Sequence, residues 1–404
     1  MLPVETFLIA VGVAAVLTPL VRSAALRYGM LDAVGGRKVH TKPIPRIGGV
    51  AIVGGFYAAI GVLLLVHSGL RQQLMADGSG LLAMLVGGLA IAIAGFCDDL
   101  FDASARLKFC IQIAVACGLY AFGFRVTTVT MPWGVMSLGL LSLPVTVLWI
   151  VGVTNAVNLI DGLDGLAGGV SLIALAAVFF VGASRGDAFM MLFSAALGGA
   201  VLGFLFYNFN PATIFMGDTG SMFLGFMLAV CSIKAGQKSS TAVALFPVAL
   251  LALPLCDTVV AMWRRLASGL PPFTGDREHF HHRLLARGLS HRHAVTTLYG
   301  VASIFATLAV VLYDATGWLL LGSIGGLVLM LHTLLSQLGY YRDLVPRRRT
   351  AQNVVTVVAL TRVQPVAVPT TMRRVLRRRV IPSVADASLV AVPRRVRRDS
   401  YIGE

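Results

Sequence analysis

The chain has 404 residues, of which 57% are hydrophobic and 13% are charged, and it carries a formal net charge of +15. This composition excludes an ordinary soluble domain, because the first 340 residues contain too few polar side chains to cover a folded surface. Apolar runs of roughly 17–25 residues recur instead, and each is long enough to cross a hydrocarbon core of about 30 Å as a helix. We therefore predict an all-α polytopic membrane protein.

The apolar runs predict about eleven membrane-spanning helices, taken here in chain order. The first run lacks a basic start and a small-residue cleavage site, so we expect a retained helix rather than a signal peptide. The expected bounds are 5–24, 47–67, 80–97, 107–124, 136–154, 164–183, 188–207, 217–233, 241–262, 294–313 and 316–337.

The connections between these helices fall alternately on two sides of the membrane, and the two sides differ in basic residues. The side that includes 21–46, 264–292 and the C-terminal tail holds 28 Lys and Arg residues, against 5 on the other side. Because cytoplasmic loops carry the excess of positive charge, we predict an external N-terminus and a cytoplasmic C-terminus. Proximity to a membrane thus accounts for the basic residues, and we expect no nucleic acid partner.

Composition changes sharply near residue 340. We predict a transmembrane domain over 1–340 and a basic cytoplasmic tail over 341–404, which contains Arg clusters such as 373–379. Such an arm is typically solvated and contacts anionic lipid headgroups.

Apart from the tail, the polar clusters lie at the cytoplasmic ends of the predicted spans. A transporter more often has ionisable residues near the middle of the membrane, on broken helices, whereas these helix middles are almost free of charge. The arrangement favours an enzyme with its active site on the cytoplasmic face. The clusters are Asp98, Asp99 and Asp102; Asn155 to Asp164; Asn208, Asn210 and Asp218; Asp257; and Asp276, His279, His281 and His282.

The adjacent acids Asp98 and Asp99 predict a metal site. Two neighbouring like charges repel each other unless a cation offsets them, and Asp218 is expected on the same face. Oxygen ligands without cysteine favour Mg²⁺, with Mn²⁺ as the alternative, and Mg²⁺ is usually bound by a few carboxylates together with substrate phosphates. Asp102 either lines the same surface or caps a turn.

The segment TNAVNLIDGLDGLAGG (154–169) interrupts an apolar stretch with four polar side chains. Asn155, Asn158 and Asp161 recur every three residues, as on one face of a tight turn or helix end. Asp164 either joins them or caps the following helix by accepting from its free N–H groups. The glycines allow a ligand to approach the backbone closely.

The three histidines of DREHFHHRLL (276–285) suggest either zinc or phosphate binding. Adjacent His281 and His282 cannot share the usual one-turn spacing of zinc ligands, and no fourth ligand is near in sequence. The neighbouring Arg277, Arg283 and Arg287 favour phosphate.

These clusters, in this order, resemble the polyprenyl-phosphate N-acetylhexosamine-1-phosphate transferase family. The resemblance covers roughly residues 20–300 and rests on RKVHTKPIPRIGG (37–49), DDLFD (98–102), NAVNLIDGLDGLAGG, NPATIFMGDTGS (210–221) and DREHFHHRLL. It implies transfer of N-acetylglucosamine 1-phosphate, or a related sugar phosphate, from a UDP-sugar to undecaprenyl phosphate, with release of UMP. The HFHHRL motif resembles the branch that uses UDP-N-acetylglucosamine; the alternative is the phospho-MurNAc-pentapeptide transferase of peptidoglycan synthesis.

The resemblance also implies roles for individual residues. Asp98 and Asp99 are expected at the lipid phosphate and the metal, Asp218 is a principal metal ligand, and Asp161 and Asp164 belong to the catalytic loop. The remaining expected residues are Lys108 near the lipid phosphate; Asn158 at the metal; Asn155, Asn158, Asn208 and Phe215 around the nucleotide; His279, His281 and His282 at the phosphates of the sugar nucleotide; and Lys38 and Arg46 as further substrate contacts.

The resemblance places the protein in the bacterial cytoplasmic (inner) membrane as a multi-pass enzyme. It leaves both a monomer and a homodimer open. The lipid phosphate is already ionised near neutral pH, so we expect direct attack on the UDP-sugar rather than a covalent Asp intermediate.

Overall fold

Long helices form most of the part of the chain that the computed structural model describes, namely residues 1–32, 43–69, 71–72, 80–131, 134–237, 245–271, 278–315 and 317–340. The predictions for Lys38, Asp276 and the tail (341–404) fall outside these residues. The helices are α1 (Leu2–Tyr28), α2 (Gly49–Val66), α4 (Gly80–Phe101), α5 (Ala105–Ala121), α6 (Ser142–Ile160), α7 (Leu166–Arg185), α8 (Ala188–Asn208), α9 (Gly217–Gln237), α10 (Leu245–Leu250), α11 (Ala252–Ala267), α12 (Phe280–Ala286), α13 (His291–Asp314) and α14 (Gly317–Gln337).

Within the described residues, nine helices are long and apolar enough to cross a membrane. The protein is therefore a multi-pass, predominantly helical membrane protein, as predicted, whereas the orientation and the total of eleven spans stay predictions. The two expected spans outside this set are 107–124, which overlaps the 17-residue helix α5, and 241–262.

The single helix expected over 241–262 is divided, within its described residues, into two helices, α10 and α11. They meet at Leu251, which has φ −106° and ψ 19°. Pro254 lies in the first turn of α11 and has no N–H to donate to the preceding turn, which favours a helix boundary at this point.

The expected span over 136–154 is displaced by six residues. A short antiparallel hairpin, β3 (Thr128–Met131) and β4 (Gly134–Ser137), comes first, and α6 then runs from Ser142 to Ile160. An apolar strand and an apolar helix turn have the same hydropathy, so the hydropathy pattern did not distinguish this hairpin from the start of a helix. As a result Asn155 and Asn158 lie on the last turns of α6 rather than in a loop.

Helix α9 lies at the centre of the packing, against α2, α4, α6, α7, α8 and α10. In its most apolar stretch of 18 residues, 94% are buried, compared with 11% for α14. Gly49 of α2 and Gly220 of α9 let these two helices touch, because a Cβ on Gly49 would lie 2.1 Å from Gly220 N. Small residues at such crossings are typical of membrane helices.

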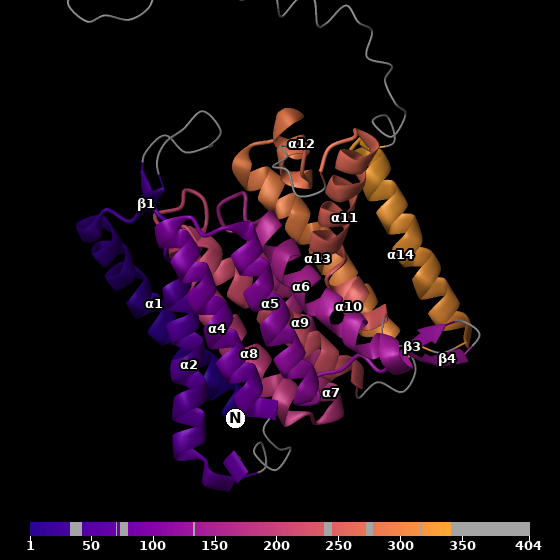
Figure 1. Ribbon diagram of the computed structural model, residues 1–404, viewed down its shortest axis with the longest axis horizontal. Coiled ribbons are helices and arrows are strands. Elements are labelled where there is room, and N and C mark those ends of the chain that lie inside the picture. The colour runs from indigo at the N-terminus through magenta and orange to yellow at the C-terminus, as the bar shows by residue number, and fades with distance from the viewer. Residues whose placement is uncertain are drawn as a thin grey trace, which may run out of the picture. The chain divides into compact units, whose positions relative to one another are not determined.

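The functional residues gather at one end of this bundle. A second antiparallel pair consists of β1 (Leu31–Asp32) and β2 (Ile44–Pro45). In Figure 1 β1 and α12 both lie toward the upper end, whereas β3 and β4 lie at the lower end. Apart from α10 to α12, consecutive helices run in alternate directions, so the upper end holds the ends of α4, α6 and α8 and the starts of α7, α9 and α13. We call it the polar end, defined by Asp98, Asp161, Asp218 and His279.

Gly49→Ala should destabilise the protein, since the added methyl group forces α2 and α9 apart. Overpacking of this kind costs about 1–3 kcal/mol. Gly61→Ala in the same helix is the matched control, because a Cβ there meets nothing within 4 Å. Thermal unfolding in detergent measures both variants, and equal melting temperatures would contradict the close packing.

Candidate active site

Asp99 joins the end of α4 to the start of α9. Its Oδ1 accepts a hydrogen bond from Asp218 N at 2.8 Å, and its Oδ2 accepts from Thr219 N at 3.0 Å and Thr219 Oγ1 at 2.6 Å. The side chain is only 6% exposed. The first N–H groups of a helix have no partner within it, and Asp99 supplies this partner from another helix. Its predicted role as a metal ligand stays a prediction.

Lys108 connects three helices through two ion pairs. Its Nζ lies 3.1 Å from Asp98 Oδ2 and 2.9 Å from Asp218 Oδ2. These side chains are partly exposed, between 16% and 24%. The structure thus brings Asp98, Lys108 and Asp218 together on the polar end.

Asp161 and Asn158 complete this cluster from the end of α6. The Asn158 side chain lies beside the Asp218 carboxylate, and Asp161 follows the last residue of α6. Burial, and then the charges of Asp218, Asp99 and Asp164, raise the pKa of the Asp161 carboxyl to about 7. The cluster therefore contains four acidic side chains and one lysine, namely Asp98, Asp99, Asp161, Asp218 and Lys108.

This set of donors fits a hard divalent cation. Within the described residues, no three His, Cys, Asp or Glu side chains already form a group that could hold a metal. Mg²⁺, however, usually binds one or two carboxylates together with waters and substrate phosphates. Asp218, Asn158 and their neighbours offer oxygen ligands and an excess of negative charge, which is the chemistry that Mg²⁺ requires.

Asp164 does not cap α7, which was one of the two roles that the sequence left open for it. Gly165 is the N-cap residue of α7, and its φ of 79° suits glycine. The Asp164 Oδ2 instead accepts hydrogen bonds from Asn210 Nδ2 at 2.8 Å and Ala212 N at 3.0 Å. Asp164 therefore holds the loop between α8 and α9 against the turn after α6.

Asn208 reinforces the same contact from the end of α8. Its Oδ1 accepts from Gly165 N and its Nδ2 donates to Ile214 O, both at 3.0 Å, and the residue is buried. Both the oxygen and the nitrogen of the Asn208 amide thus form hydrogen bonds within the protein. The backbone of Phe215 pairs with Pro45 O and Gly48 N. The nucleotide contacts predicted for Asn208 and Phe215 stay predictions.

Asn155 and Arg46, which were also predicted as substrate contacts, form hydrogen bonds to neighbouring helices. Asn155 Nδ2 donates to Gln112 Oε1 at 2.6 Å and so joins α6 to α5. Arg46 donates from Nε to the carbonyl of Asp99, and its Nη2 lies 3.1 Å from Asp102 Oδ1. Arg46 therefore lies at the end of α4, beside the acidic cluster.

Asp257, for which we predicted no role from the sequence, holds the histidine motif. Asp257 Oδ2 lies 3.0 Å from His279 Nδ1, and its Oδ1 accepts from Phe280 N at 2.9 Å; all three residues are buried. Asp257 thus orients His279 at the start of α12. A lone acid in an apolar helix needs a partner, and that signal could have predicted its role.

His281 is buried against the turn after α6. Its ring is parallel to that of His279, at a centroid distance of 5.9 Å. A Cβ on Gly162 would lie 2.4 Å from His281 Nε2, so glycine is required at this contact. Burial, followed by the charges of the neighbouring histidines, lowers the pKa of His281 to about 3. The ring is therefore neutral near pH 7, whereas His282 beside it is partly exposed.

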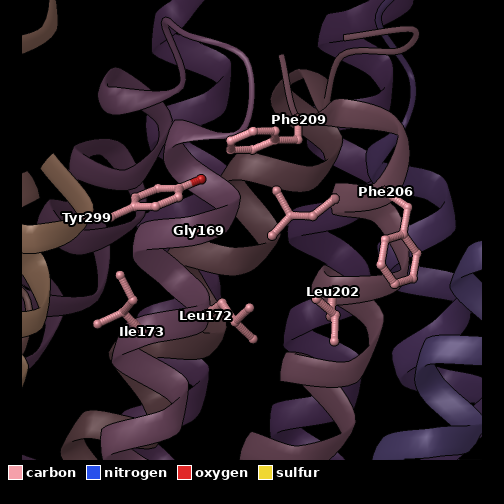
Figure 2. Close-up of a pocket in the computed structure, with 8 residues that line it drawn as sticks. Gly169, Leu172, Ile173, Leu202, Phe206, Phe209 and Tyr299 are labelled. Carbon is pink, nitrogen blue, oxygen red and sulfur yellow. The ribbon is translucent and has the colours of Figure 1, made fainter. Parts of the chain in front are cut away.

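A large apolar groove lies next to the polar end rather than within it. It has a volume of about 500 Å³ and is formed by α7, α8 and α13 (Figure 2). Tyr299 and Phe209 line its upper part, and the Tyr299 hydroxyl donates to Gly165 O at 2.6 Å. The predicted site residues do not line this groove. Its residues are Gly169, Leu172, Ile173, Leu202, Leu205, Phe206, Phe209 and Tyr299.

Comparison with known proteins identifies the family. The sequence model of glycosyl transferase family 4 matches residues 81–236, which contain Asp98, Lys108, Asp161 and Asp218. A probable undecaprenyl-phosphate N-acetylglucosaminyl 1-phosphate transferase of Bacillus subtilis is 40% identical over 343 residues, covering 84% of this chain and 93% of that protein. The chain belongs to glycosyl transferase family 4.

Two further relatives of this family 4 protein come from other bacteria. The decaprenyl-phosphate N-acetylglucosaminephosphotransferase of Mycolicibacterium smegmatis is 35% identical over 306 residues, covering 70% of this chain and 75% of that protein. The undecaprenyl-phosphate alpha-N-acetylglucosaminyl 1-phosphate transferase of Escherichia coli is 28% identical over 301 residues, covering 72% and 78%. The family predicted from the five motifs is confirmed.

The raised pKa of Asp161 predicts a pH-dependent stability of the metal-free family 4 protein. The carboxyl ionises near about 3.9 in an unfolded chain but near about 7 in the folded one. The folded state therefore loses stability as the pH rises between these values, by up to roughly 4 kcal/mol. Asp161→Asn removes this loss.

Thermal unfolding in the presence of EDTA, between about pH 5 and about pH 8, measures the effect. The melting temperature of the wild type should fall more steeply than that of Asp161→Asn. Parallel curves for the two proteins would contradict the burial of this acid among its neighbours.

Proposed function

We propose that this family 4 protein transfers N-acetylglucosamine 1-phosphate from UDP-N-acetylglucosamine to undecaprenyl phosphate and releases UMP. The observation that carries the proposal is the cluster of Asp98, Lys108 and Asp218 at one end of a membrane bundle. A lipid phosphate in the bilayer and a nucleotide in the cytoplasm can both reach such a position. The names of the three relatives, which specify N-acetylglucosamine and a polyprenyl phosphate, support this donor and acceptor.

In the proposed reaction, an oxygen of the lipid phosphate attacks the β-phosphorus of the UDP-sugar. The new P–O bond forms as the bond from this phosphorus to the bridging oxygen breaks, and UMP leaves with that oxygen and its electron pair. Both reactants are anionic, so Lys108 lowers their mutual repulsion by pairing with the lipid phosphate. Since that phosphate is already ionised, Asp98 positions it and no strong base is required.

Asp218 and Asn158 are the residues that would hold Mg²⁺ or Mn²⁺, with Asp99 and the substrate phosphates beside them. When bound there, the ion would neutralise charge at the diphosphate and would stabilise the leaving UMP. Asp99 also fixes the first turn of α9, which sets the position of Asp218. Asp161, ionised more readily when a cation is near, adds negative charge on the same side.

The loops around Asp164, Asn208 and Phe215 would form the nucleotide side of the site. The histidine motif faces the turn after α6 from the other side, because His281 packs on Gly162. Neutral His281 offers a hydrogen bond rather than a positive charge. His282, which is partly exposed, would contact the phosphates of the UDP-sugar.

The alternatives have less support. Relatives that are named for N-acetylglucosamine favour this sugar over MurNAc-pentapeptide. A transporter would have its ionisable residues near the middle of the membrane. Most of the described acids lie instead at the polar end, and Glu5, Asp187 and Asp314 lie at helix ends on the opposite side. We place this end in the cytoplasm and the protein in the bacterial inner membrane, in accord with the distribution of basic residues.

Purified protein with undecaprenyl phosphate, Mg²⁺ and a panel of UDP-sugars should release UMP from UDP-N-acetylglucosamine. EDTA should stop the reaction, and Mn²⁺ should restore it. UDP-MurNAc-pentapeptide should give no UMP. Absence of UMP with every UDP-N-acetylhexosamine would contradict the proposed function.

Two acid-to-amide variants should separate chemistry from helix capping. Asp218→Asn should lower turnover by at least about a hundredfold, the usual scale for a lost electrostatic contact at a reacting phosphate, with little change in melting temperature. Asp99→Asn should lower turnover and also stability, by about 1–3 kcal/mol, because an amide cannot accept all three hydrogen bonds from α9.

Glu5→Gln is the control, since Glu5 is exposed and lies on the first turn of α1. Activity and melting temperature should both match the wild type. If Asp99→Asn were as stable as Asp218→Asn, the capping role of Asp99 would be wrong.

A further inference from the structure

The first turns of α13 contact both loops on the nucleotide side of the site. His291 Nε2 accepts a hydrogen bond from Asp164 N at 2.9 Å. Arg292 Nε donates to Asn210 O at 3.0 Å. Two turns further along, the Tyr299 hydroxyl donates to Gly165 O at 2.6 Å. One helix thus contacts two segments that lie far from it in the sequence.

The two loops are also joined directly to each other. Asp164 accepts from Asn210 and Ala212, and Asn208 bridges Gly165 and Ile214. The turn after α6, the loop after α8 and the start of α13 therefore form one hydrogen-bonded unit. A displacement of any of the three would strain bonds to the other two.

His291 supplies the acceptor for Asp164 N within this unit. Neighbouring N–H groups of the turn bond locally, as Asp161 N does to Asn158 O and Gly162 N to Ile160 O. Asp164 N points instead at a ring 127 positions away in the sequence. Both side chains are largely buried, with 18% of His291 and 16% of Asp164 exposed.

The geometry also defines the state of the ring. Nε2 must carry no proton if it accepts a hydrogen bond, so the proton of the neutral ring is on Nδ1. The Asp164 carboxylate faces the same nitrogen at 4.0 Å, and His281 is near enough for the two rings to interact. His291 therefore acts as a hydrogen-bond acceptor at this position.

We infer that His291 is a positioning residue, which fixes the turn that holds Asp161 and Asp164 against the loop that leads to Phe215. The inference rests on the proposed function. It assigns His291 to the UDP-sugar side of the site, without contact to either substrate. The lipid phosphate side, built from Asp98 and Lys108, does not depend on it.

Two substitutions test the position of the acceptor. In His291→Gln the amide oxygen reaches the place of Nε2, whereas in His291→Asn the shorter side chain reaches only the place of Nδ1. His293→Gln is the matched control, because the His293 side chain is exposed and its ring bonds to Ser290 within its own turn.

The KM for UDP-N-acetylglucosamine should rise about tenfold in His291→Asn, the scale of a buried donor left without its acceptor. It should stay within about threefold of the wild type in His291→Gln. The KM for undecaprenyl phosphate should be unchanged in both variants. Equal donor KM values for His291→Asn and the wild type, or a matching rise in acceptor KM, would overturn the inference.

Hydrogen–deuterium exchange gives a readout that does not depend on activity. Peptides that cover 158–170 should exchange faster in His291→Asn than in His291→Gln, His293→Gln or the wild type. Unchanged exchange in His291→Asn would overturn the inference even in an active enzyme. A wild type that releases no UMP, with the expected exchange pattern, would instead overturn the proposed function, and the role at the UDP-sugar side with it.

Discussion

The active site depends on one interaction between helices, the hydrogen bonds from the first turn of α9 to the Asp99 carboxylate. Helix α9 is the most buried of the nine apolar helices in the described part of the chain, so water is not freely available to its terminal N–H groups. The Asp99 carboxylate of α4 takes the place of water and accepts hydrogen bonds from this first turn. Because Asp98 precedes Asp99 and Asp218 begins α9, this bond brings two further carboxylates to the same place.

The site therefore has two walls of different chemistry. Asp98, Lys108 and Asp218 form a charged wall in which a single lysine lies between two acids. The opposite wall consists of loops held by amides, backbone groups and buried histidines. Asp257 orients His279, and His281 packs on Gly162 as a neutral ring. This division suits a reaction between a lipid phosphate, which needs charge compensation, and a nucleotide, which needs positioning.

The sequence predicted which acids of the charged wall lie together, but it did not predict the contacts that hold the opposite wall. Asp98, Asp99 and Asp218 end or begin apolar runs on the same side of the membrane, so topology alone brought them together. Contacts such as that of His291 with Asp164 join residues 127 positions apart, and no local pattern marks them. Helix bounds failed where hydropathy is ambiguous, at the β3–β4 hairpin before α6 and at the break between α10 and α11.

Transfer of the sugar together with its phosphate is the central claim, and the fate of the β-phosphate tests it most directly. UDP-N-acetylglucosamine labelled with ³²P in the β-phosphate should be incubated with the protein, undecaprenyl phosphate and Mg²⁺. The account predicts that the label passes into the lipid phase and that unlabelled UMP remains in water. Label that stays in a water-soluble nucleotide while sugar enters the lipid would contradict it.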